Sequence, residues 1–389
     1  MHGAVPARDV VLVTGYPGFI AQRLVARMVE LRRRPGSRPL RVVALARPQN
    51  ADAARRELAA LDMGRDAGEA GEVLEGDVTQ MHLGLSGAEY KRTVAETTEI
   101  WHLAASYDLS ADPHLIRAVN VDGTRGVLEL ARAARGLSRL HHFSSAYVSG
   151  DRTGVVLEDE LDMGQRFDDA YARTKFEAEK LVRRAQAELP ITIYRPSMVV
   201  GDSRTGEIHR FDGPYFLGLL LVATPVPVPL PLPSEGGAPL NAVPVDFVVE
   251  AALSIGRNAG AIGRTVHLVD PAPLSVRRVY EMIAARVGKT LPKGTVPHRA
   301  VEAVLRLPFL ERASRPQRSA LQLVNRLVLY NPRNMLDLLA GTSIRCPSID
   351  TYLDRLVDFV KTHHRAAAPA VKAAEAEDPL APSPRSPRK

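Results

Sequence analysis

Short apolar runs alternate with longer amphipathic segments through most of the chain. The runs are rich in branched side chains and predict strands over 10–13, 40–46, 73–77, 100–105, 140–143, 191–195 and 265–269. Between them, apolar positions at helical spacing predict a helix that begins at Phe19 and helices over 51–61, 113–135 and 168–188. Strands and helices that alternate in this way are typical of an α/β fold with a doubly wound parallel sheet.

The pattern changes after Gly201. Residues 201–213 are polar and Gly-rich, and 225–233 alternate Pro with Val or Leu, which predicts a stiff, extended apolar segment. Helices are expected over 275–288, 298–306, 316–328 and 349–362. We therefore divide the chain into a sheet domain over 1–205, to which 240–270 returns, a smaller and mostly helical region over 206–363, and a disordered tail over 364–389.

Composition and charge narrow the class of protein. The 389 residues have a net charge of +7 without an aromatic-interleaved basic patch, so we expect no nucleic-acid partner. The single Cys346 excludes an internal disulfide and favours a reducing compartment, so we expect a cytoplasmic protein. Prolines interrupt the uncharged stretch over 213–234, so no transmembrane segment is expected, although peripheral membrane contact by 215–233 stays open.

A Gly-rich turn follows the first predicted strand and opens the first helix. Gly15 suits a sharp reversal of the backbone, and Gly18 lets the backbone approach a ligand closely. Ala21 takes the third small position, where the helix packs against the strand. A helix N-terminus behind such a turn favours an anion, which predicts a dinucleotide pyrophosphate there. An ordinary turn between a strand and a helix is the alternative.

Several polar side chains lie where a parallel sheet places its ligands, at the carboxyl ends of strands. Tyr171 and Lys175 share one face of a helix, so the ammonium is expected to lower the pKa of the phenol. Ser145 follows the strand over 140–143 and can bind a carbonyl oxygen. Asn120 is unusual inside a helix, and Asp77 can accept from an adenine amino group.

Other polar groups favour structural roles. We expect His102 to be a satisfied histidine at a strand end rather than a catalyst. The acidic residues Asp159, Glu160 and Asp162 are expected in a solvated loop. No spacing of His, Cys or carboxylate residues predicts a metal site.

Taken in order, these motifs resemble the extended short-chain dehydrogenase/reductase superfamily over about the first 200 residues. The resemblance rests on segments 14–20, 76–78, 102–105, 120–124 and 143–148, the Tyr171/Lys175 pair and segment 195–197. It implies a Rossmann NAD(P)-binding domain over 1–205 and a substrate-binding region over 206–363. The implied cofactor-binding residues are Gly15, Tyr16, Pro17, Gly18, Phe19, Ile20, Arg47, Asp77, Val78, Leu103, Ala104, Ala105, Tyr171, Lys175, Pro196 and Ser197.

The resemblance also assigns catalytic roles. Tyr171 is implied as the general acid/base, Lys175 as the residue that binds the nicotinamide ribose, and Ser145 as the group that polarises the carbonyl. Asn120 matches the helix Asn of the catalytic tetrad. At the end of the second strand, where NAD enzymes of this type carry an acid, the chain has Arg47, which can pair with a 2′-phosphate. NADPH is therefore the expected cofactor, with NADH as the alternative.

Later segments resemble fatty acyl-CoA reductases and thioester reductase domains, of the male-sterility type. They are 195–207, 212–215, 241–248 and 339–347 with Tyr352. This resemblance implies reduction of an acyl thioester, bound to coenzyme A or to an acyl carrier protein, to an aldehyde or alcohol. A sterol-like alcohol dehydrogenase, a nucleotide-sugar epimerase or dehydratase, and a non-catalytic cofactor-binding protein stay open as alternatives, as does the oligomeric state.

Overall fold

The computed structural model describes residues 8–33, 37–61, 71–107, 112–208, 237–288 and 326–363. Seven parallel strands form its central sheet in the order β10-β7-β5-β4-β1-β2-β3. The strands are β1 (Asp9–Thr14), β2 (Leu40–Ala46), β3 (Glu72–Glu75), β4 (Glu99–His102), β5 (Arg139–Phe143), β7 (Ile191–Pro196) and β10 (Thr265–Leu268). This order reverses between β1 and β4, which confirms the predicted doubly wound parallel sheet.

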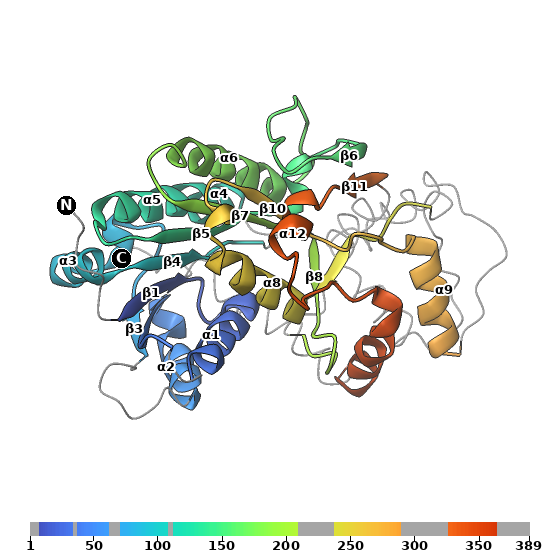
Figure 1. The fold of residues 1–389 in the computed structure, drawn as a ribbon, viewed down its shortest axis with the longest axis horizontal. Helices are drawn as coiled ribbons and strands as arrows, with labels where there is room; N and C mark the ends of the chain where they lie inside the picture. Colours follow the sequence, from blue (N-terminus) through green and yellow to red (C-terminus); the bar gives the residue numbers. More distant parts are fainter. Residues whose placement is uncertain are drawn as a thin grey trace, which may run out of the picture.

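Helices cover both faces of the sheet (Figure 1). One face packs against α1 (Phe19–Arg32), α2 (Ala51–Ala60) and α8 (Val245–Arg257). The other packs against α5 (Gly123–Ala133) and α6 (Ala170–Ala185), with α3 (Gly87–Glu96) at the end of that layer. Because both faces are covered, the central strands β1 and β2 are apolar at nearly every position, as is typical of a parallel sheet.

The predicted helix over 113–135 is interrupted. It consists of α4 (Pro113–Arg117), a π-helical turn over Ala118–Asp122 and α5. The Asp112 carboxylate caps α4, whose first residue is proline. Asn120 lies in the π-helical turn, a feature that is common at functional sites and that hydrophobic spacing does not reveal.

A second apolar cluster lies beyond the sheet (Figure 1). It joins β8 (Met198–Val200) and β9 (Ala242–Pro244), a parallel pair, to α9 (Val276–Arg286) and to a helix over 353–363. Phe19, the first residue of α1, packs against this cluster and also against the core of the sheet. The smaller helical part thus sits directly beside the Gly-rich turn.

A parallel ribbon of two short strands packs against Ala146 in the segment after β5, and Figure 1 shows its two strands side by side. It pairs β6 (Gly154–Val156) with β11 (Val328–Tyr330), and α12 (Arg333–Leu338) follows β11. The predicted helix over 316–328 lies mostly outside the described residues, and its end is wrong because Val328 begins β11. The predicted helix over 298–306, the Pro-rich segment and the tail also lie outside the described residues.

Candidate functional site

The turn between β1 and α1 is built closely around its glycines. Gly15 has φ +83°, and a Cβ there would lie 2.6 Å from the backbone nitrogen of Ala104 at the end of β4. Gly18 donates its backbone N–H to the Gly15 carbonyl at 2.8 Å. No side chain caps the N-terminus of α1, which begins at Phe19 after a cis Tyr16–Pro17 peptide. The turn therefore presents backbone N–H groups and the positive end of the helix dipole.

His102 ties the ends of β1 and β4 to α5. The Thr124 hydroxyl donates to the Asn120 carbonyl at 2.6 Å, so it accepts from His102 Nε2 at 3.0 Å. His102 Nδ1 then accepts from the Thr14 hydroxyl at 2.7 Å. Burial, and after it the charge of Lys175, lowers the pKa of His102 to about 3. His102 is thus neutral and fully bonded, and the expectation of a structural histidine is confirmed.

Two adjacent serines end β5 and have different partners. The Ser144 hydroxyl donates to the buried Glu179 carboxylate at 2.6 Å. The Ser145 hydroxyl accepts from the backbone N–H of Tyr147 at 3.2 Å and makes a hydrogen bond with the Tyr171 side chain. Ser145, and not Ser144, is therefore the serine that meets Tyr171.

The pKa of Tyr171 is raised to about 12, mainly because the phenol is buried, although the hydrogen bond with Ser145 opposes this. The expected lowering by Lys175 is wrong for this structure. Lys175 is buried, and its Nζ donates to the Phe143 carbonyl at 2.5 Å. Its pKa is lowered to about 8 by burial, and Glu179 acts in the opposite direction. Helical spacing places the two side chains on one face, but the strand end decides where the ammonium points.

Asn120 joins the loop after β4 to α6. Its Oδ1 accepts from the backbone N–H of Ser106 at 2.7 Å, and its Nδ2 donates to the Ser106 carbonyl at 3.0 Å and to the Thr174 hydroxyl at 2.9 Å. Both hydrogens of the Asn120 amide are therefore used in hydrogen bonds. One of the acceptors, Thr174, directly precedes Lys175 in the chain. Among the described residues, the hydrogen bonds of the Asn120 side chain go to Ser106 and Thr174 and not to Ser145 or Tyr171.

Arg47 and Asp77, expected to meet different parts of a cofactor, lie against each other. Arg47 Nε is 3.6 Å from Asp77 Oδ2, and the Arg47 side chain is 6% exposed. The other Asp77 oxygen accepts from the backbone and hydroxyl of Thr79. Nearby, Val78 is buried against Gly123 in α5. The pairing follows from the adjacency of β2 and β3 in the sheet.

The remaining expected cofactor residues line the same edge of the sheet. Ala104 donates its backbone N–H to the Thr14 hydroxyl at 3.3 Å, and Leu103 and Ala105 flank it, with Leu103 packed against the core cluster. Pro196 ends β7. The backbone N–H of Ser197 donates to the Leu268 carbonyl at 3.1 Å, and its buried hydroxyl has no hydrogen-bond partner in the described part of the chain.

A small pocket lies beside Tyr147, two residues after Ser145. Its lining residues are Tyr147, Met198, Pro239, Leu240, Asn241, Arg326, Val328 and Tyr330. Arg326 is fixed at this pocket by the Gly150 carbonyl and by the Asp168 carboxylate at 2.6 Å. The hydrophobic pattern did not identify Arg326 or Tyr330, because Arg326 falls inside the predicted helix over 316–328 and Tyr330 lies just beyond its end. The signal for Tyr147 was its place two residues after Ser145.

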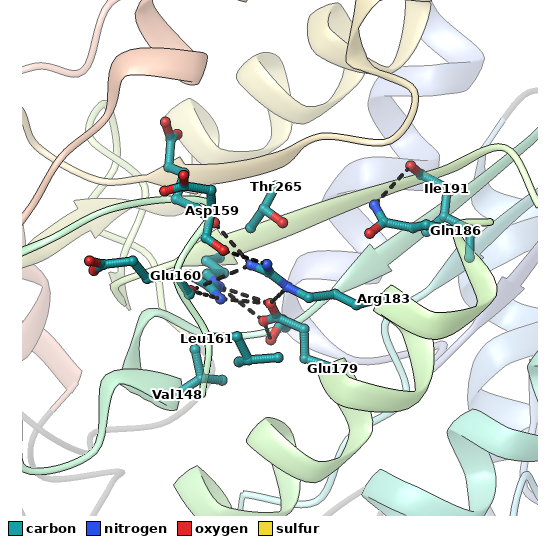
Figure 2. A network of polar contacts seen from close by, with 12 residues as sticks. Val148, Asp159, Glu160, Leu161, Glu179, Arg183, Gln186, Ile191 and Thr265 are labelled. Atoms are coloured by element: carbon teal, nitrogen blue, oxygen red, sulfur yellow. Dashed lines mark hydrogen bonds and ion pairs between the residues drawn. The ribbon is translucent and has the colours of Figure 1, made fainter. Parts of the chain in front are cut away.

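A buried ion network lies behind the two serines. Arg195 and Glu179 are both fully buried and form an ion pair at 2.7 Å, and Arg183 joins it at 2.9 Å. Figure 2 shows Glu179 and Arg183 facing the loop that carries Asp159 and Glu160. Arg183 donates to the carbonyls of Glu158, Asp159 and Glu160, at 2.9, 2.6 and 3.4 Å. The carbonyls of this loop therefore have a structural role.

The described residues contain no group of three or more His, Cys, Asp or Glu side chains that could hold a metal ion. In the same ranges, no helix combines the length and the apolar character needed to cross a membrane.

Comparison with known proteins identifies a protein family whose model matches this chain. A family model described as male sterility protein matches residues 13–252. Glycine betaine reductase ATRR of Emericella nidulans is 30% identical over 304 residues, which are 74% of this chain and 22% of that protein. Nonribosomal peptide synthetase asaC of Aspergillus flavus is 28% identical over 69% of this chain and 27% of its own length. The chain thus spans less than a third of either relative.

Two solved structures are similar to this chain in fold. The terminal R domain from the myxalamid PKS-NRPS biosynthetic pathway is 28% identical, with a TM-score of 0.75 over 92% of both chains. UDP-glucuronic acid 4-epimerase from Bacillus cereus in complex with NAD is 18% identical, with a TM-score of 0.64 over 92% of this chain and 98% of the epimerase. At that identity the epimerase shows only a shared fold.

Proposed function

Because the chain belongs to the male sterility protein family of NAD-binding domains, in the extended short-chain dehydrogenase/reductase superfamily, we propose that it is an NADPH-dependent reductase of acyl thioesters. The observation that carries the proposal is the Ser145–Tyr171 hydrogen bond at the end of β5, next to a pocket with a largely apolar lining. The similarity to the myxalamid R domain supports a thioester as the substrate class.

The residues at the sheet edge fit a nicotinamide dinucleotide. The uncapped N-terminus of α1 suits the pyrophosphate, and Asp77 and Val78 suit the adenosine end. Lys175 uses one of its three N–H donors on the Phe143 carbonyl, so two are left for the hydroxyls of a ribose. When bound, the cofactor supplies a hydride to the carbonyl carbon of the substrate. Arg47 supports NADPH over NADH, because it follows the end of β2, where its guanidinium can pair with a 2′-phosphate.

The chain's own residues stabilise the oxygen of the reacting carbonyl. With a pKa raised to about 12, Tyr171 keeps its proton at neutral pH and can donate it to a developing oxyanion. The Ser145 hydroxyl can donate a second hydrogen bond to the same oxygen. Collapse of the resulting hemithioacetal breaks the C–S bond and releases an aldehyde and a free thiol. A second round of reduction gives an alcohol.

The pocket supports an acyl group attached to a larger carrier. Met198, Leu240 and Val328 offer apolar contacts, and Asn241 and Arg326 offer hydrogen-bond donors at the same pocket. Such a lining suits an acyl chain followed by a polar amide arm. The nonribosomal peptide synthetase among the relatives supports an acyl carrier protein as partner, with coenzyme A thioesters as the simpler substrate.

A substrate panel tests this function. The purified chain is mixed with NADPH and with acyl thioesters of coenzyme A and of carrier protein, and NADPH absorbance, free thiol and aldehyde are measured. We expect thiol and aldehyde with wild type and none with Tyr171→Phe. Failure to turn over any thioester contradicts the proposal. Turnover of sterol-like alcohols, tightly retained NAD⁺, or NADPH binding without oxidation would point instead to the dehydrogenase, epimerase or non-catalytic alternative.

A further inference from the structure

We propose that Glu179 is a positioning residue of this site: its buried carboxylate keeps Lys175 protonated and holds Ser144, and with it Ser145, at the end of β5. This inference rests on the proposed function for its kinetic consequence. No step of the chemistry described above involves Glu179, which lies behind the serines and away from the pocket lining.

Glu179 joins three elements through its two oxygens. Its Oε2 accepts from the Ser144 hydroxyl at 2.6 Å and from Arg195 Nε at 2.9 Å. Its Oε1 accepts from the other arm of Arg195 at 2.7 Å and from Arg183 at 2.9 Å. The carboxylate therefore locks α6 to the ends of β5 and β7 with charge-assisted hydrogen bonds, which are geometrically specific. Figure 2 shows Glu179 on α6 at the centre of this network.

The fixed position of Ser144 determines that of Ser145. The Ser144 backbone N–H donates to the Tyr194 carbonyl on β7 at 2.8 Å, so this residue is held on both its backbone and its side chain. Ser145 follows at φ −153° and ψ 149°, an extended conformation from which its hydroxyl accepts from Tyr147. Without the Ser144–Glu179 bond, the strand end loses its side-chain anchor one residue before the catalytic hydroxyl.

The charges around Lys175 explain the second role. His102 on β4 and His142 on β5 face it, and both are neutral at physiological pH because burial lowers their pKa values. Tyr171, on the same helix, keeps its proton because its pKa is raised. Glu179 lies one helical turn after Lys175 and favours its charged form against the effect of burial, which lowers the pKa of Lys175 to about 8.

Arg195 belongs to the same network but acts on Glu179 rather than on Lys175. Its guanidinium also donates to the Glu160 carbonyl at 2.8 Å and to His267 Nε2 at 3.2 Å. Replacement of Glu179 alone leaves Arg195 buried without its carboxylate, which is the costly way to break a buried pair. Removal of both charges avoids that cost, so a double variant separates the effect on Lys175 from a folding defect.

The test measures the pKa of Lys175 directly. Cofactor-free protein carrying lysine labelled with ¹³C at Cε is titrated by NMR, and the Lys175 signal is assigned with Lys175→Arg. The variants are Glu179→Gln, Glu179→Asp and the double variant E179Q/R195Q. Glu177→Gln is the matched control, because Glu177 lies on the same helix and pairs with Arg117 at the surface.

We expect Glu179→Gln and the double variant to lower the pKa of Lys175 by about one unit. Glu179→Asp and Glu177→Gln should leave it near the wild-type value. In turnover assays kcat falls at alkaline pH. The apparent pKa of that fall should be lower by the same amount in the two charge-removing variants, with KM for the thioester little changed. An unchanged pKa of Lys175 in a folded E179Q/R195Q protein overturns the inference. If the wild type reduces no thioester, the proposed function fails, while the NMR titration still decides whether Glu179 controls Lys175.

Discussion

Replacement of Gly15 by alanine should damage the nucleotide-binding turn in two separable ways. Gly15 has φ +83°, and a non-glycine residue in this region costs about 1–2 kcal/mol. The added Cβ would also lie 2.6 Å from Ala104 N, 2.8 Å from Leu103 C and 2.9 Å from Ala104 Cα. These are backbone atoms of the neighbouring strand end, so relief requires a backbone shift that costs about 1–3 kcal/mol more. The expected loss in free energy of unfolding is about 2–5 kcal/mol.

Gly263 provides a matched control. Its φ of +78° is almost the same, but a Cβ there would have no heavy atom within 4 Å. Gly263→Ala should therefore cost only the conformational term of about 1–2 kcal/mol. The gain from a stiffer unfolded chain is similar for both variants and cancels in the comparison.

Urea unfolding of both variants measures the conformational cost and the cost of the backbone contact. NADPH titration measures how far each variant weakens cofactor binding. We expect Gly15→Ala to lose about 1–3 kcal/mol more than Gly263→Ala, because the backbone contact is added. It should also bind NADPH more weakly, whereas Gly263→Ala should bind it normally. Equal losses of stability in the two variants would refute the close packing of this turn against β4.

Three further changes test the rest of the site. Ser145→Ala should lower kcat by about 10²–10³ because an oxyanion donor is lost, whereas Ser275→Ala, which removes a helix cap at α9, should affect stability alone; equal activity in the two variants would contradict the role of Ser145. Burial keeps His102 neutral with a pKa of about 3, so below pH 6.5 the unfolded chain binds a proton that the folded chain does not, and stability falls as pH falls. His102→Gln should reduce the fall in free energy of unfolding between pH 7 and pH 5 by about 2 kcal/mol, as measured by urea unfolding at the two pH values, and an identical fall in wild type and variant would be the contrary result. Arg47→Asp should shift the ratio of kcat/KM from NADPH towards NADH, and an unchanged ratio, or a wild type that uses NADH equally well, would show that Arg47 does not select the cofactor.

The central sheet was predictable because most of its strands are short runs of branched apolar residues, a pattern typical of strands that are buried on both faces. The helix α8 was not, although 240–270 was expected to return to the sheet domain. Its sequence is dense in apolar and β-branched residues, and no side chain caps its N-terminus after Pro244. Val248 and Val249 follow Phe247, and such a run of β-branched and aromatic residues can equally be read as a strand.

The site was predictable in its residue types and less so in its contacts. The role of Ser145 stays a prediction, and in the structure Ser145 interacts with Tyr171 whereas Ser144 binds Glu179. The direction of Lys175 towards the Phe143 carbonyl depends on how β5 ends beneath α6, which spacing along a helix does not encode. The Arg47–Asp77 pair likewise requires knowledge that β2 and β3 are neighbours. Roles assigned to single residues by motif therefore needed the tertiary structure to show which side chains share a partner.

The measurement that tests the proposed reduction most directly follows the hydride. The chain is incubated with an acyl thioester and with NADPH carrying deuterium at the transferable position of the nicotinamide, and the products are analysed by mass spectrometry. The account predicts an aldehyde with one deuterium on its former carbonyl carbon, or an alcohol with two, and one free thiol for each acyl group reduced. Free thiol without deuterated product, or no product from any thioester by a protein that binds NADPH, would contradict it.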